Sequence, residues 1–319
     1  MSVELSIVNG STIYYPPVKT GITWTTERKG TPGVLKFTVV KTENADFAEG
    51  NPVRLIINGE KVFFGFIFKK SRNKEQLIEV TAYDQLRYLK NKETYVYKEK
   101  SAAQVVQMIA ADFNLSVGSL DDTGYIIPAK VEDNKTLFDI IQDALDDTMT
   151  SRKKMYVLYD DFGRLMLKDI ENMKVNILID ETTGQNYTYE SSIDDQTYNQ
   201  IKLVYENEET GKREVYIAKD SANINEWGVL QYYETVSSDV GVIEKVNTLL
   251  SLYNQKTRKL KINSAFGDIR VRAGSSVIVI MNLGDIQVRN LMVCEKVVHK
   301  FENDLHTMDL TLRGGTFIA

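Results

Sequence analysis

The sequence has a single cysteine, Cys294, only two histidines and only five prolines among its 319 residues. One cysteine excludes a disulfide within the chain and fits folding in a reducing compartment. Two histidines are too few for most zinc centres, because no carboxylates accompany them at helical spacing. No proline-, glycine- or serine-rich linker divides the chain, so we expect packed modules and no flexible tethers.

Long hydrophobic runs are also missing. The longest stretch without a charge, residues 5–18, contains serines, an asparagine, a glycine and two prolines, which predicts that it does not span a bilayer. The first nine residues include Glu4 and no basic segment before an apolar core, so we expect no signal peptide. A net charge of −5 disfavours binding to a nucleic-acid backbone as the main task.

What the chain does contain is one strand pattern that occurs twice. Residues Gly50 to Ala82 and Gly274 to Leu312 each follow it. Each copy starts with an alternating strand, turns at Asn58-Gly59 in the first copy and near 282–285 in the second, and continues into an apolar block. A charged loop and a last alternating strand follow, which predicts a small barrel or a strongly curved sheet in each copy. Two such units favour a structural part over a catalyst.

The fold class that these patterns predict is α+β and mainly β, with two similar barrel-like domains and helical and hairpin insertions between them. We expect a first barrel-like domain at 1–92, a helical domain at 93–150, a small hairpin-containing domain at 151–185, and a second barrel-like domain at 186–319 with a helix near 239–255. Helix caps are expected at Asp84, Ser101 and Thr136. The apolar strand positions that we expect in the two barrel cores are Trp24, Val53, Leu55, Val277, Val279 and Leu310.

Several short strings imitate catalytic motifs. Asp122-Thr123-Gly124 is the triplet of aspartic proteases, but it occurs once and in a loop context, so we interpret it as a turn. Asp161-Phe162-Gly163 copies a kinase triplet without the other kinase motifs, and a hairpin turn explains it better. Cys294 lies in an apolar strand run, where a buried thiol is the default. We therefore predict no catalytic, cofactor-binding or metal-binding residues.

Three basic clusters, residues 69–74, 152–154 and 256–261, lie beside acidic neighbours, which is typical of solvated faces. They leave open a contact with nucleic acid or with an acidic partner. The seventeen tyrosines, many at alternating strand positions, suit half-buried sheets and wide protein contacts.

Several segments together resemble a known family. They are the run from Trp24 to Phe37, Gly50-Asn51-Pro52-Val53, the block Val62 to Phe68, Val80 to Leu89 with its tyrosine-aspartate turn, and the carboxy-terminal strings at 267–268, 297–301 and 306–310. This set is similar to the baseplate hub proteins of contractile phage tails and phage-tail-like bacteriocins, the late control protein D-like family. The resemblance covers nearly the whole chain.

The resemblance implies a non-enzymatic homotrimer. Two similar domains per subunit would form a ring of six that matches a sixfold tail tube to a threefold spike around an axial channel. The implied partners are the spike, tail tube, tape measure and baseplate wedge proteins, with no cofactor, no specific nucleic acid and no membrane insertion. The implied location is the baseplate of a virion or tailocin particle, after synthesis in the host bacterial cytoplasm.

Other functions stay open at this point. The nearest are the tail-tip hub of a noncontractile phage and the spike base of a type VI secretion system. A tail-associated wall hydrolase or protease depends on the Asp122 triplet alone. A carbohydrate or single-strand nucleic-acid binding module is the third possibility, because small barrels often have that role.

Overall fold

The computed structural model describes residues 1–42, 46–184, 186–194, 196–207, 211–236, 239–282 and 287–314. The amino-terminal part is built from strands only. They are β1 (Val3–Asn9), β2 (Thr12–Tyr14), β3 (Val18–Glu27), β4 (Val34–Val40), β5 (Pro52–Ile57), β6 (Glu60–Arg72) and β7 (Leu77–Tyr83). Buried and exposed side chains alternate along β4 and β5, as the period-two pattern predicts.

The middle part mixes helices with short strands. It contains the 3₁₀ helix η1 (Gln85–Lys90), β8 (Lys92–Lys100), α1 (Ala102–Asp112), β9 (Val117–Leu120), β10 (Ile127–Thr136), α2 (Leu137–Arg152), β11 (Tyr156–Asp160), β12 (Leu165–Asp169) and the 3₁₀ helix η2 (Ile170–Met173). All three predicted caps are confirmed. Asp84 and Thr136 accept a backbone N–H in the first turn that follows, and Ser101 forms a capping box with Gln104.

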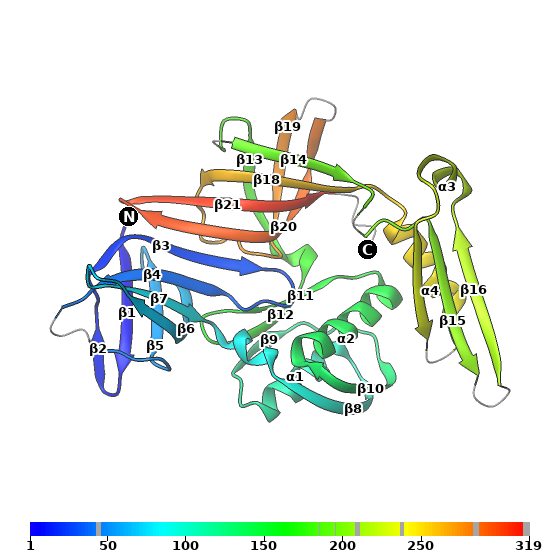
Figure 1. The fold of residues 1–319 in the computed structure, drawn as a ribbon, viewed down its shortest axis with the longest axis horizontal. Helices are drawn as coiled ribbons and strands as arrows, with labels where there is room; N and C mark the ends of the chain where they lie inside the picture. The colour runs from blue at the N-terminus through cyan, green and yellow to red at the C-terminus, as the bar shows by residue number, and fades with distance from the viewer. Residues whose placement is uncertain are drawn as a thin grey trace.

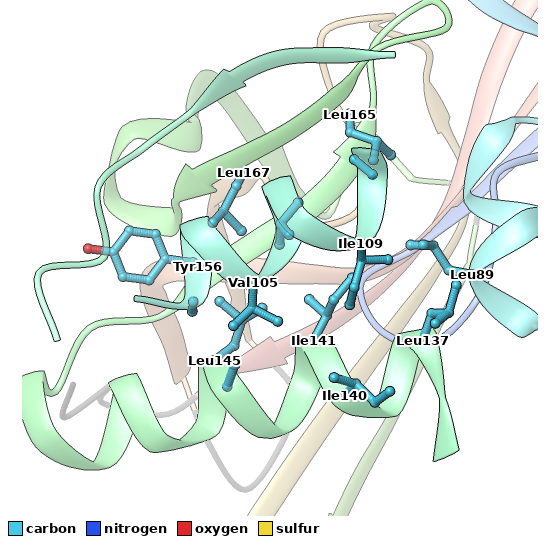
Figure 2. Close-up of a cluster of buried hydrophobic side chains, with 14 of the residues drawn as sticks. Leu89, Val105, Ile109, Leu137, Ile140, Ile141, Leu145, Tyr156, Leu165 and Leu167 are labelled. Atoms are coloured by element: carbon cyan, nitrogen blue, oxygen red, sulfur yellow. The ribbon is translucent and has the colours of Figure 1, made fainter. Parts of the chain in front are cut away.

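One hydrophobic core holds this middle part together. The apolar stripes of α1 and α2 face each other and the β11–β12 hairpin, and Figure 2 shows Val105, Ile109, Ile141 and Leu167 converging between them. Each helix buries only one face, because its apolar residues recur at helical spacing.

The carboxy-terminal part returns to strands. It contains β13 (Lys174–Asp180), β14 (Asn186–Ser192), β15 (Gln200–Asn207), β16 (Lys212–Lys219), α3 (Ser221–Trp227), β17 (Gln231–Val236), α4 (Val242–Tyr253), β18 (Thr257–Phe266), β19 (Ser276–Asn282), β20 (Gln287–Glu302) and β21 (Leu305–Gly314). Strands β15, β16 and β17 form a small separate sheet that packs against α4.

A thirteen-stranded sheet joins the two ends of the chain. Its order is β14-β18-β21-β20-β3-β4-β7-β6-β5-β1-β2, with β19 on β20 and β13 on β19 as a branch. In Figure 1 it runs from the blue strands to the orange and red ones, with the helical part below and the small sheet at one end. Among the described residues none of the sheets closes into a barrel, so each barrel-like unit is part of an open sheet.

The prediction of a mainly β, α+β chain is confirmed. The predicted turn near 282–285 falls mostly on residues outside the described ranges. The helix expected near 239–255 begins at Val242, and Gly241 stands at its N-cap without a side-chain hydrogen bond. The four-domain division at 92, 150 and 185 stays a prediction.

Candidate functional site

Two groups of five strands have the same arrangement. We name β3 to β7 unit A, and β14 with β18 to β21 unit B. The order in unit A is β5-β6-β7-β4-β3, the order in unit B is β19-β20-β21-β18-β14, and every neighbouring pair is antiparallel. The strands also occur in the same sequence order within each unit. The predicted repetition of strand order is therefore confirmed.

Residue registers also agree along the central row of the two units, whereas a shift between Ile262 and Ala265 in β18–β21 has no counterpart in β4–β7. A row across unit A pairs Trp24 with Leu35, Leu35 with Ala82 and Ala82 with Ile67. The corresponding row across unit B consists of Tyr189, Leu260, Leu312 and Cys294. In both units the ladder shifts at the next residue, between Ile67 and Lys69 in unit A and between Cys294 and Lys296 in unit B. A bulge at one matching position is a specific feature, because it changes the local twist and is not required by strand order alone.

The turn before β5 and β19 repeats too. Gly50 has a φ of 88° and Gly274 a φ of 93°, a conformation that favours glycine. The Gly50 N–H donates to the Ile67 carbonyl at 2.7 Å, and the Gly274 N–H donates to the Cys294 carbonyl at 2.8 Å. When the two glycines are matched, Val53 corresponds to Val277. Ile78 corresponds to Met308, because Ile78 pairs with Arg72 and Met308 pairs with His299, the equivalent of Arg72.

The six apolar positions expected in the cores divide between the two units. Trp24, Val53 and Leu55 belong to the cluster inside unit A, and Val277, Val279 and Leu310 belong to the cluster inside unit B. All six are buried. Their burial on one face of each unit follows from the alternation of the strands.

Unit B joins unit A directly through β20 and β3. We name this junction the internal seam: residues 296–301 of β20 pair antiparallel with residues 22–27 of β3. Lys296 Nζ lies 2.7 Å from Glu27 Oε1, and the ring of His299 stacks on Trp24 with centroids 4.8 Å apart. The sequence did not predict the seam, because two strands that lie about 270 residues apart in the chain leave no local signal of their pairing.

A buried polar cluster lies where both units meet the β11–β12 hairpin. Asp84 accepts the N–H groups of Gly33 at 2.9 Å and Leu86 at 3.1 Å. Gln85 donates to Asp160 Oδ2 at 2.8 Å, and Arg272 donates to the Asp160 carbonyl at 2.8 Å. Burial raises the pKa of Asp84 well above its usual range and the pKa of Asp160 to about 6. Sequence reasoning missed this cluster, since its members come from three distant segments.

The two histidines contact each other inside unit B. His299 Nε2 lies 2.8 Å from the Val271 carbonyl, and its Nδ1 lies 2.9 Å from His306 Nε2. Because a carbonyl only accepts, His299 carries its proton on Nε2, and its Nδ1 accepts from His306. Burial lowers the pKa of His299 to about 3 and also lowers the pKa of His306. Both imidazoles are therefore neutral near pH 7.

The imitated catalytic motifs lie in turns, as expected. Asp122 is exposed, and its Oδ1 accepts the Gly124 N–H at 2.9 Å. Asp161 and Arg164 exchange backbone hydrogen bonds that close the β11–β12 hairpin. Cys294 is fully buried, and burial raises the pKa of its thiol far above the usual range. Within the described residues no three His, Cys, Asp or Glu side chains gather in a metal-type cluster.

Parts of two basic clusters meet at one cleft of about 160 Å³. Lys154 and Lys256 line it together with Arg28 and Arg313, and Asp169 faces them. Lys154 Nζ lies 3.2 Å from Asp169 Oδ2. The third basic cluster lies elsewhere, at the carboxyl end of β6.

A family model described as YQBQ-like matches residues 22–313, a range that contains nearly all of both units. The chain belongs to the YQBQ-like family. Two Bacillus subtilis (strain 168) proteins are similar to it over 82% of this chain and 81% of their own length: the phage-like element PBSX protein XkdQ, 29% identical, and the protein YqbQ, 31% identical.

Two solved structures share the fold of this chain. A tail protein from Neisseria meningitidis MC58 superposes with a TM-score of 0.74 at 12% identity, over 99% of this chain and 98% of its own. The E. coli c3393 protein, a type VI secretion component with structural similarity to the T4 tail proteins gp27 and gp5, superposes with a TM-score of 0.60 at 10% identity, over 98% of this chain and 78% of its own. No helix among the described residues is long and apolar enough to cross a membrane.

Proposed function

We propose that this chain is a phage-tail structural protein, and more specifically the baseplate hub of a contractile tail. The observation that carries the proposal is the agreement of units A and B in strand order, in the register of the central row, in one bulge and in the glycine turn. A subunit that presents one surface twice lets three copies match a partner with sixfold symmetry. The relation to XkdQ of a phage-like element and the tail-protein fold support the same role.

In this role the chain works mechanically. Three subunits place six units around an axial channel, with the tail tube on one side and the threefold spike on the other. The tape measure and baseplate wedge proteins contact the same ring, in the baseplate of a virion or tailocin. The α1–α2 core and the β15–β17 sheet lie outside the two units, and in this role they reach the surrounding baseplate.

A second candidate within the same class is the spike base of a type VI secretion system, which the fold shared with c3393 favours. A tail-tip hub of a noncontractile phage would use the same two units. The partners distinguish these machines, since only a contractile tail or secretion system has a sheath around the tube.

Deleting the gene from its particle-producing host and imaging the particles by electron microscopy tests the role. A hub is needed to start the tube, so we expect no assembled tails, and restored tails when the gene is supplied in trans. Complete, active particles without the chain would contradict the proposal. Purified tails that carry the chain and a contracted sheath would separate the contractile hub from the noncontractile one.

A further inference from the structure

The internal seam has a counterpart that is unpaired among the residues that the structure describes. Equivalent registers place residues 69–72 of β6 where unit B has 296–299 of β20, and residues 189–192 of β14 where unit A has 24–27 of β3. The equivalents of these two edges, 296–299 in unit B and 24–27 in unit A, pair with each other in the internal seam. Among the described residues, 69–72 pair only with β7 and β14 pairs only with β18. Each chain thus has one closed seam and the two halves of a second, open one.

We infer that these two edges pair between chains, the β6 edge of one copy with the β14 edge of a second copy of this chain. The strands run antiparallel, with Lys69 opposite Ser192, Lys70 opposite Ser191, Ser71 opposite Glu190 and Arg72 opposite Tyr189. This register is obtained from the internal seam alone, by replacing each residue with its equivalent. The inference deepens the hub role and rests on it, because it names the partner and the contact of the repeated units.

The side chains at these positions fit one another. His299 stacks on Trp24 in the internal seam, and the equivalent pair is Arg72 over Tyr189, a cation over an aromatic ring. Tyr189 is half-buried and Arg72 is exposed, so both have surface available for the contact.

Charge complementarity supports the same pairing. Lys69 lies diagonal to Glu190 on one face of the proposed ladder, within reach of a long side chain. The internal seam carries the opposite-charge pair Lys296 and Glu27 on its own strands.

The bulge residue beside the seam fits in a different way. Arg28 donates to Glu295 at 2.9 Å next to the internal seam. Their equivalents are Ile193 and Phe68, both half-buried, so an apolar contact replaces the ion pair. Neither pair leaves an unpaired charge at this position, and an unpaired charge at a strand junction would be costly.

The contact is head-to-tail, because it joins two different edges. Such heterologous contacts produce closed rings or open filaments, depending on the rotation between copies. The lysines and arginine at 69–72 also protect the edge in the free chain, since charged side chains disfavour indiscriminate strand pairing.

Cross-linking through engineered cysteines tests the register in the full-length chain. Ser71→Cys and Glu190→Cys are made as separate single variants and mixed at high protein concentration under mild oxidation. Lys70→Cys and Ser191→Cys form a second pair, because adjacent antiparallel pairs alternate in Cα separation and one of the two suits a disulfide. Cys294 is left in place, since it is fully buried. We expect each mixture to give a two-chain product and each single variant alone to give none.

Two controls fix what the result means. A Thr25→Cys/Val298→Cys variant, on opposed residues of the internal seam, should close a disulfide within one chain. Ser71→Cys mixed with Thr188→Cys, shifted by two residues, should give less product by more than about tenfold, because the shifted Cα atoms exceed disulfide reach.

The outcomes separate the seam from the hub role. If both matched pairs fail to cross-link while the internal control closes, the proposed pairing of the β6 and β14 edges between chains is wrong. Equal product from the shifted pair, or dimers of Glu190→Cys alone, also overturns it. Three chains bound to a spike without these cross-links would overturn the seam and keep the hub role. Matched cross-links in a chain that is dispensable for tail assembly would overturn the hub role and keep the seam.

Discussion

Units A and B have one fold and different surroundings. Trp24 in unit A is buried beside the paired strand β20, whereas its equivalent Tyr189 in unit B lies on an edge strand and is only half-buried. The loop between β3 and β4 is short, whereas the chain between β14 and β18 holds β15, β16, β17, α3 and α4. The glycine turn and the bulge occur in both units, so they belong to the shared fold. The burial of Trp24 occurs in unit A only, so it depends on the neighbouring strand β20.

The largest expected effect is on the shared cores. Val53→Asp and Val277→Asp each place a charge at an equivalent, fully buried position. We expect each variant to lose more than about 4 kcal/mol of unfolding free energy or to fail to fold, because an unpaired buried charge is among the costliest single changes. Urea denaturation followed by circular dichroism measures the loss. Val96→Asp, at a site 73% exposed, is the control and should change stability little. If only one of the two core variants is destabilised, the units are not equivalent.

The second prediction makes unit B more like unit A. Arg272 corresponds to Ala48 in unit A, and only Arg272 reaches the buried polar cluster, where its guanidinium lies 3.9 Å from the Tyr159 ring centroid. Arg272→Ala should cost about 1–3 kcal/mol, through a lost hydrogen bond to a buried carbonyl and lost packing.

Arg270→Ala is the matched control for this variant. Arg270 is exposed and pairs with Asp268 on the surface, so its loss should cost less than about 1 kcal/mol. Thermal unfolding measures both variants. Equal losses of unfolding free energy in Arg272→Ala and Arg270→Ala would show that the buried polar cluster contributes no more than a surface ion pair.

The third prediction is a pH dependence that comes from His299 of unit B, which stands where unit A has Arg72. The folded-state pKa of His299 is lowered by burial to about 3, so folding keeps the imidazole neutral. The stability that this neutral form contributes is fully present above about pH 6.5 and is lost as the pH falls, because the unfolded chain binds the proton first. The slope for one such group is at most about 1.4 kcal/mol per pH unit.

Replacing the imidazole isolates this slope from other groups. The raised pKa values of Asp84 and Asp160 act in the opposite direction, since the folded state then holds protons that the unfolded state releases. We expect the stability difference between the wild-type chain and His299→Gln to shrink between pH 6.5 and 4.5. A constant difference over this range would show that His299 does not stay neutral.

The smallest effect is expected outside both units. Asp122→Asn and Asp161→Asn change two turns that imitate catalytic motifs, and both should leave stability within about 0.5 kcal/mol and tail assembly unchanged. Infection or killing assays with particles carrying each variant measure this. Loss of activity in a fully assembled particle would contradict the non-enzymatic role.

Local patterns in the sequence predicted the strands, caps and turns. The caps at Ser101 and Thr136 were predictable, because each capping interaction lies within three residues along the chain. The turn at Asp161 was predictable, because hairpin turns depend on a few neighbouring residues. The repeat was visible because Gly50 and Gly274 precede the same alternation.

Long-range features were not accessible in the same way. The pairing of His299 with Trp24 and the approach of Arg272 to Asp160 depend on how whole segments dock. The small sheet of β15, β16 and β17 was expected as part of the second barrel-like domain, because alternation alone does not tell which sheet a strand joins.

The central claim is that three copies of this chain present six equivalent units. Native mass spectrometry of the purified chain, with and without the spike protein of its particle, tests this most directly. We predict a complex that contains three chains of 36.3 kDa each when the spike is bound, whether or not the free chain is already trimeric. A complex with one, two or six copies of the chain on a spike would contradict the account.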